Sequence, residues 1–385
     1  MADFDPRPDF TIGIEEEYLL VDPQDGALRA MPQAMLADLH DALGDKVSRE
    51  FLSCQVEVGT GVCATVDEAR ADLGHLRRTV QRIAKAHGLA PIAASCHPWE
   101  DWADQDRTDK PRYAQLDDDL GAVARRMLIG GMHVHVGIAD RDTRIAVMNR
   151  MTPWLPVLLG LSASSPFWQG QDTGLASWRV SVFDGMPRTG LPPRFLDWDD
   201  YDATAGVLVD LGVMEDTSKI WWDLRPSDAF PTLEARICDV SPRMEDTLTL
   251  AALVQALARM IWRGLSDETA LPNPLIVSEN RWRAQRHGTA GSLIRGAPPA
   301  MVPMAQVVDD MLNRIAPDAE ALGAAAAAGR AREIVLEGGS AARQREVYRA
   351  ARDGGASDRA ALQAVVQALI AAFDPGDEKP ARPEG

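Results

Sequence analysis

The chain has 385 residues, which allows one large domain or two to three ordinary ones. Hydrophobic residues make up 46% and charged residues 25% of it, a composition typical of a globular protein with a sizeable core. The formal net charge of −17 argues against a nucleic-acid partner, because phosphate backbones are bound by basic patches.

The acidic charge does not exclude ATP, because metal ions held by carboxylates can bind a nucleotide. Four cysteines without a CxxC pair and an acidic N-terminus without an apolar segment predict a cytoplasmic protein with reduced thiols. The most apolar stretch, 154–161, is too short to span a membrane, so no membrane association is expected.

The first quarter of the chain alternates predicted strands and helices. The segments, in chain order, are a strand over 11–21, a helix over 32–43, a strand over 53–58, a helix over 65–87 and a strand over 89–95. The helix over 65–87 has the strongest signal, because Thr65 is its expected N-cap and Glu68 completes a capping box.

The middle of the chain is less regular and its end is helical. The predictions there are a loop over 101–112, a helix over 113–128, a strand over 131–138, a helix over 141–161 perturbed by two prolines, a polar loop over 164–174, strands over 178–183, 219–224 and 231–240, and a helix over 201–211. The loop over 164–174 is long and polar, which makes it a candidate substrate loop. After Glu245 the pattern is almost wholly helical.

This order favours an α+β fold with a mostly antiparallel sheet and helices packed on one side. A doubly wound parallel sheet is disfavoured, because neither GxGxxG nor GxxxxGK[ST] occurs. We expect a single catalytic domain over 1–374, with the chemical motifs in 11–290 and a helical part over 291–374. The residues 375–385, rich in Pro, Gly and charge, are expected to form a disordered tail.

Three predicted strands carry the polar residues that suggest chemistry. Glu15 and Glu17 share one face of the first strand, and Glu16 points to the other. Two carboxylates on one face repel unless a cation lies between them, which suggests a site for hard divalent metals. A solvated acidic edge is the alternative.

His133 and His135 likewise share one strand face, between glycines that would let a ligand approach. This spacing suits metal or phosphate binding, whereas a single histidine would more often be structural. On the strand over 231–240, Glu234 and Arg236 share a face and suggest a metal ligand beside a phosphate-binding guanidinium. An exposed salt-bridged face is the alternative for this pair.

Weaker candidates complete the set. Gln55 and Glu57 share a face of the strand over 53–58, and Arg179 and Arg225 stand among bulky apolar residues. Such arginines can anchor a carboxylate or phosphate, although alone they would more often be structural. Together, these strands would form a sheet with a concave face of Glu, His and Arg side chains able to hold Mg²⁺ and a triphosphate.

Seven segments resemble the type 2 glutamate–cysteine ligase family, in particular its YbdK-type carboxylate–amine ligases. They occur in the family's order and are GIEEEY (13–18), QVEVGTGV (55–62), GMHVHVG (131–137), SPFWQG (165–170), WDLRP (222–226), PTLEAR (231–236) and NRWRAQR (280–286). The resemblance implies a glutamine-synthetase-like catalytic fold with ATP and Mg²⁺ bound over a curved antiparallel sheet.

The resemblance also implies roles for the candidates. Glu15, Glu17, Glu57, Glu234 and one of His133 and His135 would be metal ligands, with Mn²⁺ as an alternative to Mg²⁺. Glu17 and Arg236 would be catalytic residues. Four residues would contact ATP or the substrate, namely Arg179, Arg225, Arg236 and Gln55.

The implied reaction joins a carboxylate to an amine through an acyl phosphate, with glutamate and cysteine as the family's named substrates. A phosphotransferase on the same fold and a catalytically silent nucleotide-binding regulatory protein are the alternatives. A homodimer is the default expectation for the assembly.

Overall fold

The structure is a computed structural model that describes residues 8–50, 52–106, 121, 126–227, 229–267 and 270–375. The predicted helix over 113–128 lies largely outside the described residues, and the predicted disordered tail over 375–385 lies almost wholly outside them. In the described part of the chain, no helix is both long enough and apolar enough to cross a membrane.

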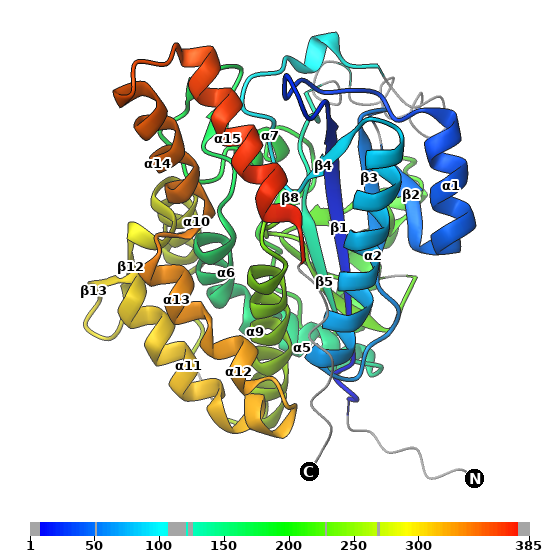
Figure 1. Ribbon diagram of the computed structural model, residues 1–385. Helices are drawn as coiled ribbons and strands as arrows, with labels where there is room; N and C mark the ends of the chain where they lie inside the picture. Colours follow the sequence, from blue (N-terminus) through cyan, green and yellow to red (C-terminus); the bar gives the residue numbers. More distant parts are fainter. Residues whose placement is uncertain are drawn as a thin grey trace, which may run out of the picture.

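A seven-stranded antiparallel sheet forms the centre of the fold (Figure 1). Its strands are β1 (Ile12–Val21), β2 (Val47–Arg49), β3 (Gln55–Gly59), β4 (Ala90–Ile92), β5 (Met132–Gly137), β10 (Leu224–Pro226) and β11 (Thr232–Ala235). The order is β10-β11-β5-β1-β3-β2, and β4 pairs with the end of β1 beyond β5. The central place of β1 brings β3, β5 and β11 together, although they are far apart in the sequence.

Three two-stranded sheets lie outside the central one: β6 (Phe167–Trp168) with β7 (Gln171–Asp172), β8 (Thr189–Gly190) with β9 (Trp221–Trp222), and β12 (Ser292–Arg295) with β13 (Ala300–Pro303). The α-helices are α1 (Gln33–Leu43), α2 (Val66–Ala86), α5 (Arg141–Met151), α6 (Leu155–Ser162), α7 (Arg179–Phe183), α8 (Trp198–Asp210), α9 (Met244–Arg263), α10 (Pro274–His287), α11 (Met304–Ala321), α12 (Ala325–Gly329), α13 (Ala331–Leu336), α14 (Gly339–Asp353) and α15 (Asp358–Phe373).

The two faces of the central sheet differ in what covers them. Residues from one face of β1, such as Ile14 and Tyr18, pack with α2, α5 and α9 in the main core. On the other face, Leu19 and Val21 join a smaller core cluster that includes residues of α15. The rest of that second face carries Glu15 and Glu17 of β1, which line a cavity there. The α+β class with an antiparallel sheet is thus confirmed.

Three sequence predictions differ from the structure. The segment 178–183, predicted as a strand from its bulky residues, contains the short helix α7, because Arg179 and its neighbours fold back onto Ser165. The predicted loop over 164–174 contains the β6–β7 hairpin, and the C-terminal part contains the β12–β13 hairpin among its helices. Such short elements depend on tertiary packing, which local patterns do not report.

The start of α2 agrees with its prediction in one half of the capping box. The Thr65 hydroxyl accepts a hydrogen bond from the Glu68 amide at 3.2 Å, as an N-cap should. The Glu68 carboxylate accepts from the Ala64 amide instead of the Thr65 amide. The helix that lies behind the sheet therefore begins where the sequence predicts.

Candidate functional site

The alternation of β1 sends its glutamates to opposite faces of the sheet. Glu15 and Glu17 line a cavity of about 350 Å³ on the less covered face. Glu16 is fully buried on the other face, where its carboxylate accepts hydrogen bonds from Arg77 at 2.6 and 2.8 Å. The predicted division of the three glutamates therefore holds, although no sequence pattern indicates the partner of Glu16.

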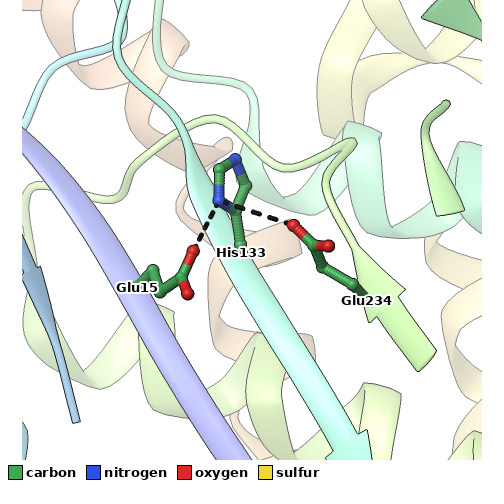
Figure 2. Close-up of side chains that lie close together, drawn as sticks. All are labelled: Glu15, His133 and Glu234. Atoms are coloured by element: carbon green, nitrogen blue, oxygen red, sulfur yellow. Dashed lines mark hydrogen bonds and ion pairs between the residues drawn. The ribbon is translucent and has the colours of Figure 1, made fainter. Parts of the chain in front are cut away.

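Glu15, His133 and Glu234 come together from three adjacent strands (Figure 2). One potential ligand atom from each lies within 4.8 Å of the others. His133 Nδ1 is 3.0 Å from Glu15 Oε2 and 3.9 Å from Glu234 Oε1. The register explains this, because β1 pairs Glu15 with His133 and β11 pairs Glu234 with His135. Within the described residues, these three could hold a metal ion.

Glu17 and Glu57 face each other across the β1–β3 pair, one strand further along the cavity. Glu17 Oε2 accepts from the Gly131 amide at 2.9 Å, and Glu57 Oε2 accepts from the Ser48 hydroxyl at 3.0 Å. Like charges directly opposite each other destabilise a sheet, so a cation bound between these two carboxylates would reduce their repulsion.

The two histidines have different surroundings. His133 is 4% exposed and contacts the carboxylates of Glu15 and, at 4.0 Å, Glu17. His135 Nδ1 lies 2.9 Å from the Thr232 hydroxyl, and its Nε2 lies 3.3 Å from Glu15 Oε1. His133 therefore occupies the centre of the acidic group, and His135 lies on its rim.

Three predicted arginines line the same cavity. Arg225 Nε donates to Glu234 Oε2 at 2.7 Å, and Arg236 Nη1 forms an ion pair with the other Glu234 oxygen. Arg179 donates to the carbonyl oxygen of Arg236 at 3.1 Å. The Nε groups of Arg179 and Arg236 are buried and have no hydrogen-bond partner among the residues that the structure describes. Unused guanidinium donors beside a cavity suit an anion such as a phosphate.

Gln55 lies in the cavity wall, yet its amide is occupied. Its Nε2 donates to the Ile129 carbonyl at 2.7 Å, and its Oε1 accepts from the Leu52 amide at 3.2 Å. The side chain is 2% exposed. These contacts favour a role in holding the wall in place over the direct substrate contact that the sequence suggested.

The electrostatics of the site reflect its mixture of charges. Burial alone would raise the pKa of the Glu15 carboxyl, but hydrogen bonds to His133 and His135 hold it well below its usual range. Burial likewise opposes ionisation of Glu234, and the two neighbouring guanidinium groups keep its pKa low. For Glu17, burial raises the pKa, and the Glu57 carboxylate adds to the effect. The carboxylates near His133 thus fit a metal ion by donor type, since hard divalent cations prefer oxygen ligands.

Gly131 has a different role from the one that its position beside the histidines predicts. The sequence predicts that its missing side chain admits a ligand, but a Cβ there would lie 2.4 Å from Arg179 Nη2. The glycine therefore lets the Arg179 guanidinium lie against the strand, while its amide holds Glu17. Gly137 similarly makes room for Thr11, whose hydroxyl would lie 2.5 Å from a Cβ.

Asp239 is a second residue that the sequence did not indicate. Its buried carboxylate accepts from the Ser164 amide and from the hydroxyls of Ser165 and Ser177, each at 2.8 Å. It thereby fixes both ends of the segment that leads to Arg179. Its partners lie 62 to 75 residues away along the chain, so no local pattern could have revealed it.

Comparisons with known proteins show the family of the chain. A family model described as glutamate–cysteine ligase family 2 matches residues 11–367. The chain is similar to proteins named "Putative glutamate--cysteine ligase 2" from Jannaschia sp. (strain CCS1), with 53% identity over 94% of this chain and 97% of the relative, and from Ruegeria pomeroyi, with 50% identity over 95% of each.

Two solved structures share the fold. A glutamate–cysteine ligase from Francisella tularensis in complex with AMP gives a TM-score of 0.69 at 14% identity, over 97% of this chain and 91% of that one. A bifunctional glutathione synthetase from Pasteurella multocida also gives 0.69, at 16% identity, over 94% of this chain and 53% of the larger protein.

Proposed function

We propose that this chain, which belongs to glutamate–cysteine ligase family 2, is an ATP-dependent carboxylate–amine ligase that forms an amide bond through an acyl phosphate. Its proposed activities include joining glutamate to cysteine, which gives γ-glutamylcysteine, ADP and phosphate. Family membership makes it a carbon–nitrogen ligase that acts on a carboxylate and an amine. The observation that carries the finer proposal is one cavity containing both the Glu15–His133–Glu234 group and guanidinium groups with unused donors. Because the proposed reaction consumes ATP, we propose that the protein acts in the cytoplasm.

The carboxylates are the proposed magnesium ligands. Glu15, Glu17, Glu57 and Glu234 offer oxygen atoms on one face of the sheet, and His133 contacts three of them within 4.0 Å. Bound Mg²⁺ would neutralise phosphate charge and orient the triphosphate for in-line attack. In the metal-free protein, the repulsion between Glu17 and Glu57 is the interaction that such a cation would relieve.

The arginines are the proposed phosphate contacts. Arg236 lies beside Glu234, and its buried Nε has no hydrogen-bond partner among the described residues. A planar guanidinium can donate two parallel hydrogen bonds to a phosphoryl group, which suits the charge that moves during transfer. Arg225 and Arg179 hold the surrounding backbone through its carbonyl oxygens, and each keeps its guanidinium at the cavity wall.

The chemical need for two steps follows from the substrate. A carboxylate is a weak electrophile, so one of its oxygens first attacks the γ-phosphorus of ATP and releases ADP. The amine nitrogen then attacks the acyl carbon, a C–N bond forms, and the C–O bond to phosphate breaks as phosphate leaves with the electron pair. The ammonium group loses one proton before its nitrogen can attack and a second as the amide forms, so the second step requires a proton acceptor.

One assay tests the proposal against a phosphotransferase and a catalytically silent nucleotide-binding protein. ADP release is measured with Mg²⁺ and glutamate, with and without cysteine, and the product is identified by mass spectrometry. A ligase releases ADP at a rate that depends on the amine and forms the amide. Phosphorylated acid that accumulates without the amine, in an amount equal to the ADP released, would indicate a phosphotransferase. No ADP release with any acid would indicate a silent protein.

A further inference from the structure

A second cavity lies beside the carboxylate cavity and is larger, at about 810 Å³. This volume is within the range of roughly 300–1,000 Å³ that small-molecule sites occupy. Its walls come from the β6–β7 hairpin, from α7 and from the segment before β5. Three of its lining residues are tryptophans, namely Trp102, Trp168 and Trp178.

The chemistry of these walls favours a flat or apolar ligand. Gln169, Gln171, Thr173 and Ser181 add polar groups without charge, and Arg126 adds a guanidinium whose Cζ lies 6.0 Å from the centre of the Trp102 ring. The carboxylate of Asp172, which also lines the cavity, is bound by two nitrogen atoms of an arginine on α14 at 2.6 and 2.8 Å. The described lining therefore offers an ammonium group no free carboxylate, whereas its indole rings bind aromatic and extended apolar groups well.

The hairpin that forms one wall is built before any ligand arrives. Gln169 and Gly170 both have positive φ, at 47° and 79°, as the two central residues of a tight hairpin turn do. The Gly170 amide donates to the Pro98 carbonyl at 3.0 Å, and Trp168 is only 9% exposed. A wall fixed in this way lowers the entropy lost on binding.

The helix α7 separates this cavity from the carboxylate cavity. Residues on one side of it, Ser181 and Val182, line the tryptophan cavity, and Arg179 and Phe183 line the other. Just before β5, Arg126 and Met127 divide in the same way. The two cavities therefore meet along one short wall, which presents Ser181, Val182 and Arg126 to the tryptophan-lined cavity and Arg179, Phe183 and Met127 to the carboxylate cavity.

We propose that the tryptophan-lined cavity binds the body of the acceptor amine, and that this acceptor carries an aromatic or extended apolar group. The inference rests on the proposed ligase function and names its acceptor class. With its body among the indoles, the acceptor places its nitrogen across α7, on the side where the carboxylates lie. Cysteine is small and leaves most of this cavity empty, so it is a poorer acceptor than a larger amine.

The test compares acceptors in the wild type and in a variant with a narrowed cavity. Gln171 is exposed on β7, so Gln171→Trp narrows the cavity without a buried change. Gln306→Trp makes the same substitution at an exposed position on α11 and is the matched control. Trp102→Ala removes one indole, and Trp102→Phe restores an aromatic ring. The acceptors are 2-phenylethylamine, cysteine and glycine, with glutamate as the acid.

Hydroxamate formation from hydroxylamine tests the proposed ligase function separately from the proposed acceptor site. It is small enough to trap the acyl phosphate as a hydroxamate without the tryptophan cavity. We expect equal hydroxamate rates in all variants, and a kcat/KM for 2-phenylethylamine above those for cysteine and glycine in the wild type. Gln171→Trp and Trp102→Ala should raise the KM for 2-phenylethylamine by about tenfold, the upper end of one aromatic contact. Gln306→Trp and Trp102→Phe should change it little.

Two results would overturn the inference while leaving the ligase intact. One is a hydroxamate-forming wild type that uses glycine as well as 2-phenylethylamine, and the other is an unchanged KM in Gln171→Trp. If no acid yields hydroxamate, the proposed function fails instead. Calorimetric titration with 2-phenylethylamine then decides the cavity's role by itself, because binding lost in Gln171→Trp supports the site and absent binding refutes it.

Discussion

Replacing Glu16 or Glu17 of β1 by glutamine should have opposite effects: one substitution should lower stability and the other should lower turnover. Glu17→Gln keeps the volume and an oxygen able to accept from the Gly131 amide at 2.9 Å. It removes a buried charge that faces Glu57, so the metal-free protein should be as stable as the wild type or more stable. Turnover should fall at least ~100-fold, or about 2.7 kcal/mol of transition-state stabilisation, as for other groups that stabilise transferring charge.

Glu16→Gln should do the reverse. Its carboxylate accepts from Arg77, from the Thr247 hydroxyl at 2.6 Å and from the Tyr18 hydroxyl at 2.6 Å, and Glu16 and Arg77 are both 0% exposed. Replacing one oxygen by an NH₂ group leaves the Arg77 charge uncompensated in the core. Breaking one partner of a buried pair costs about 3–5 kcal/mol, a large part of a typical total stability of about 5–15 kcal/mol.

The assay measures thermal and urea unfolding in chelator, together with ADP release per folded molecule in Mg²⁺. We expect Glu16→Gln to lower the unfolding midpoint while the folded fraction keeps wild-type turnover. A stable but inactive Glu16→Gln, or an unstable Glu17→Gln whose folded fraction is fully active, would refute the division of the two faces.

Three further substitutions test other parts of the site. Arg236→Lys should lower turnover at least ~100-fold, because the planar donor pair is lost. Nucleotide affinity, measured by titration with Mg²⁺, should change little, because the charge remains. Wild-type turnover would place Arg236 outside the reaction centre. Gly131→Ala should displace the Arg179 guanidinium and lower activity. Gly13→Ala should not, because the nearest atom is 3.8 Å from the new Cβ. Equal activities would show that the close contact between Gly131 and Arg179 is unimportant. Mg²⁺ should raise the Tm of the wild type but not of Glu15→Gln, and an equal rise in both would remove Glu15 from the metal ligands.

The sequence alone determined the features that depend on local periodicity. A strand repeats every two residues wherever it lies in the fold, so Glu15 and Glu17 had to share a face and Glu16 had to leave it. The same rule placed Glu234 and Arg236 together, and helical spacing with Thr65 as N-cap located α2. The family resemblance added the expected fold and the order of the motifs.

Only the tertiary structure decided which of these faces meet. The pairing of Glu16 with Arg77 joins residues 61 positions apart, and Asp239 fixes the segment before Arg179 from a similar distance. Neither has a local signature, because hydrogen-bond partners are chosen by packing and not by neighbours in sequence. Packing also explains why 178–183 contains the helix α7 and not the predicted strand. This helix forms a wall between two cavities, which no periodicity in the sequence could indicate.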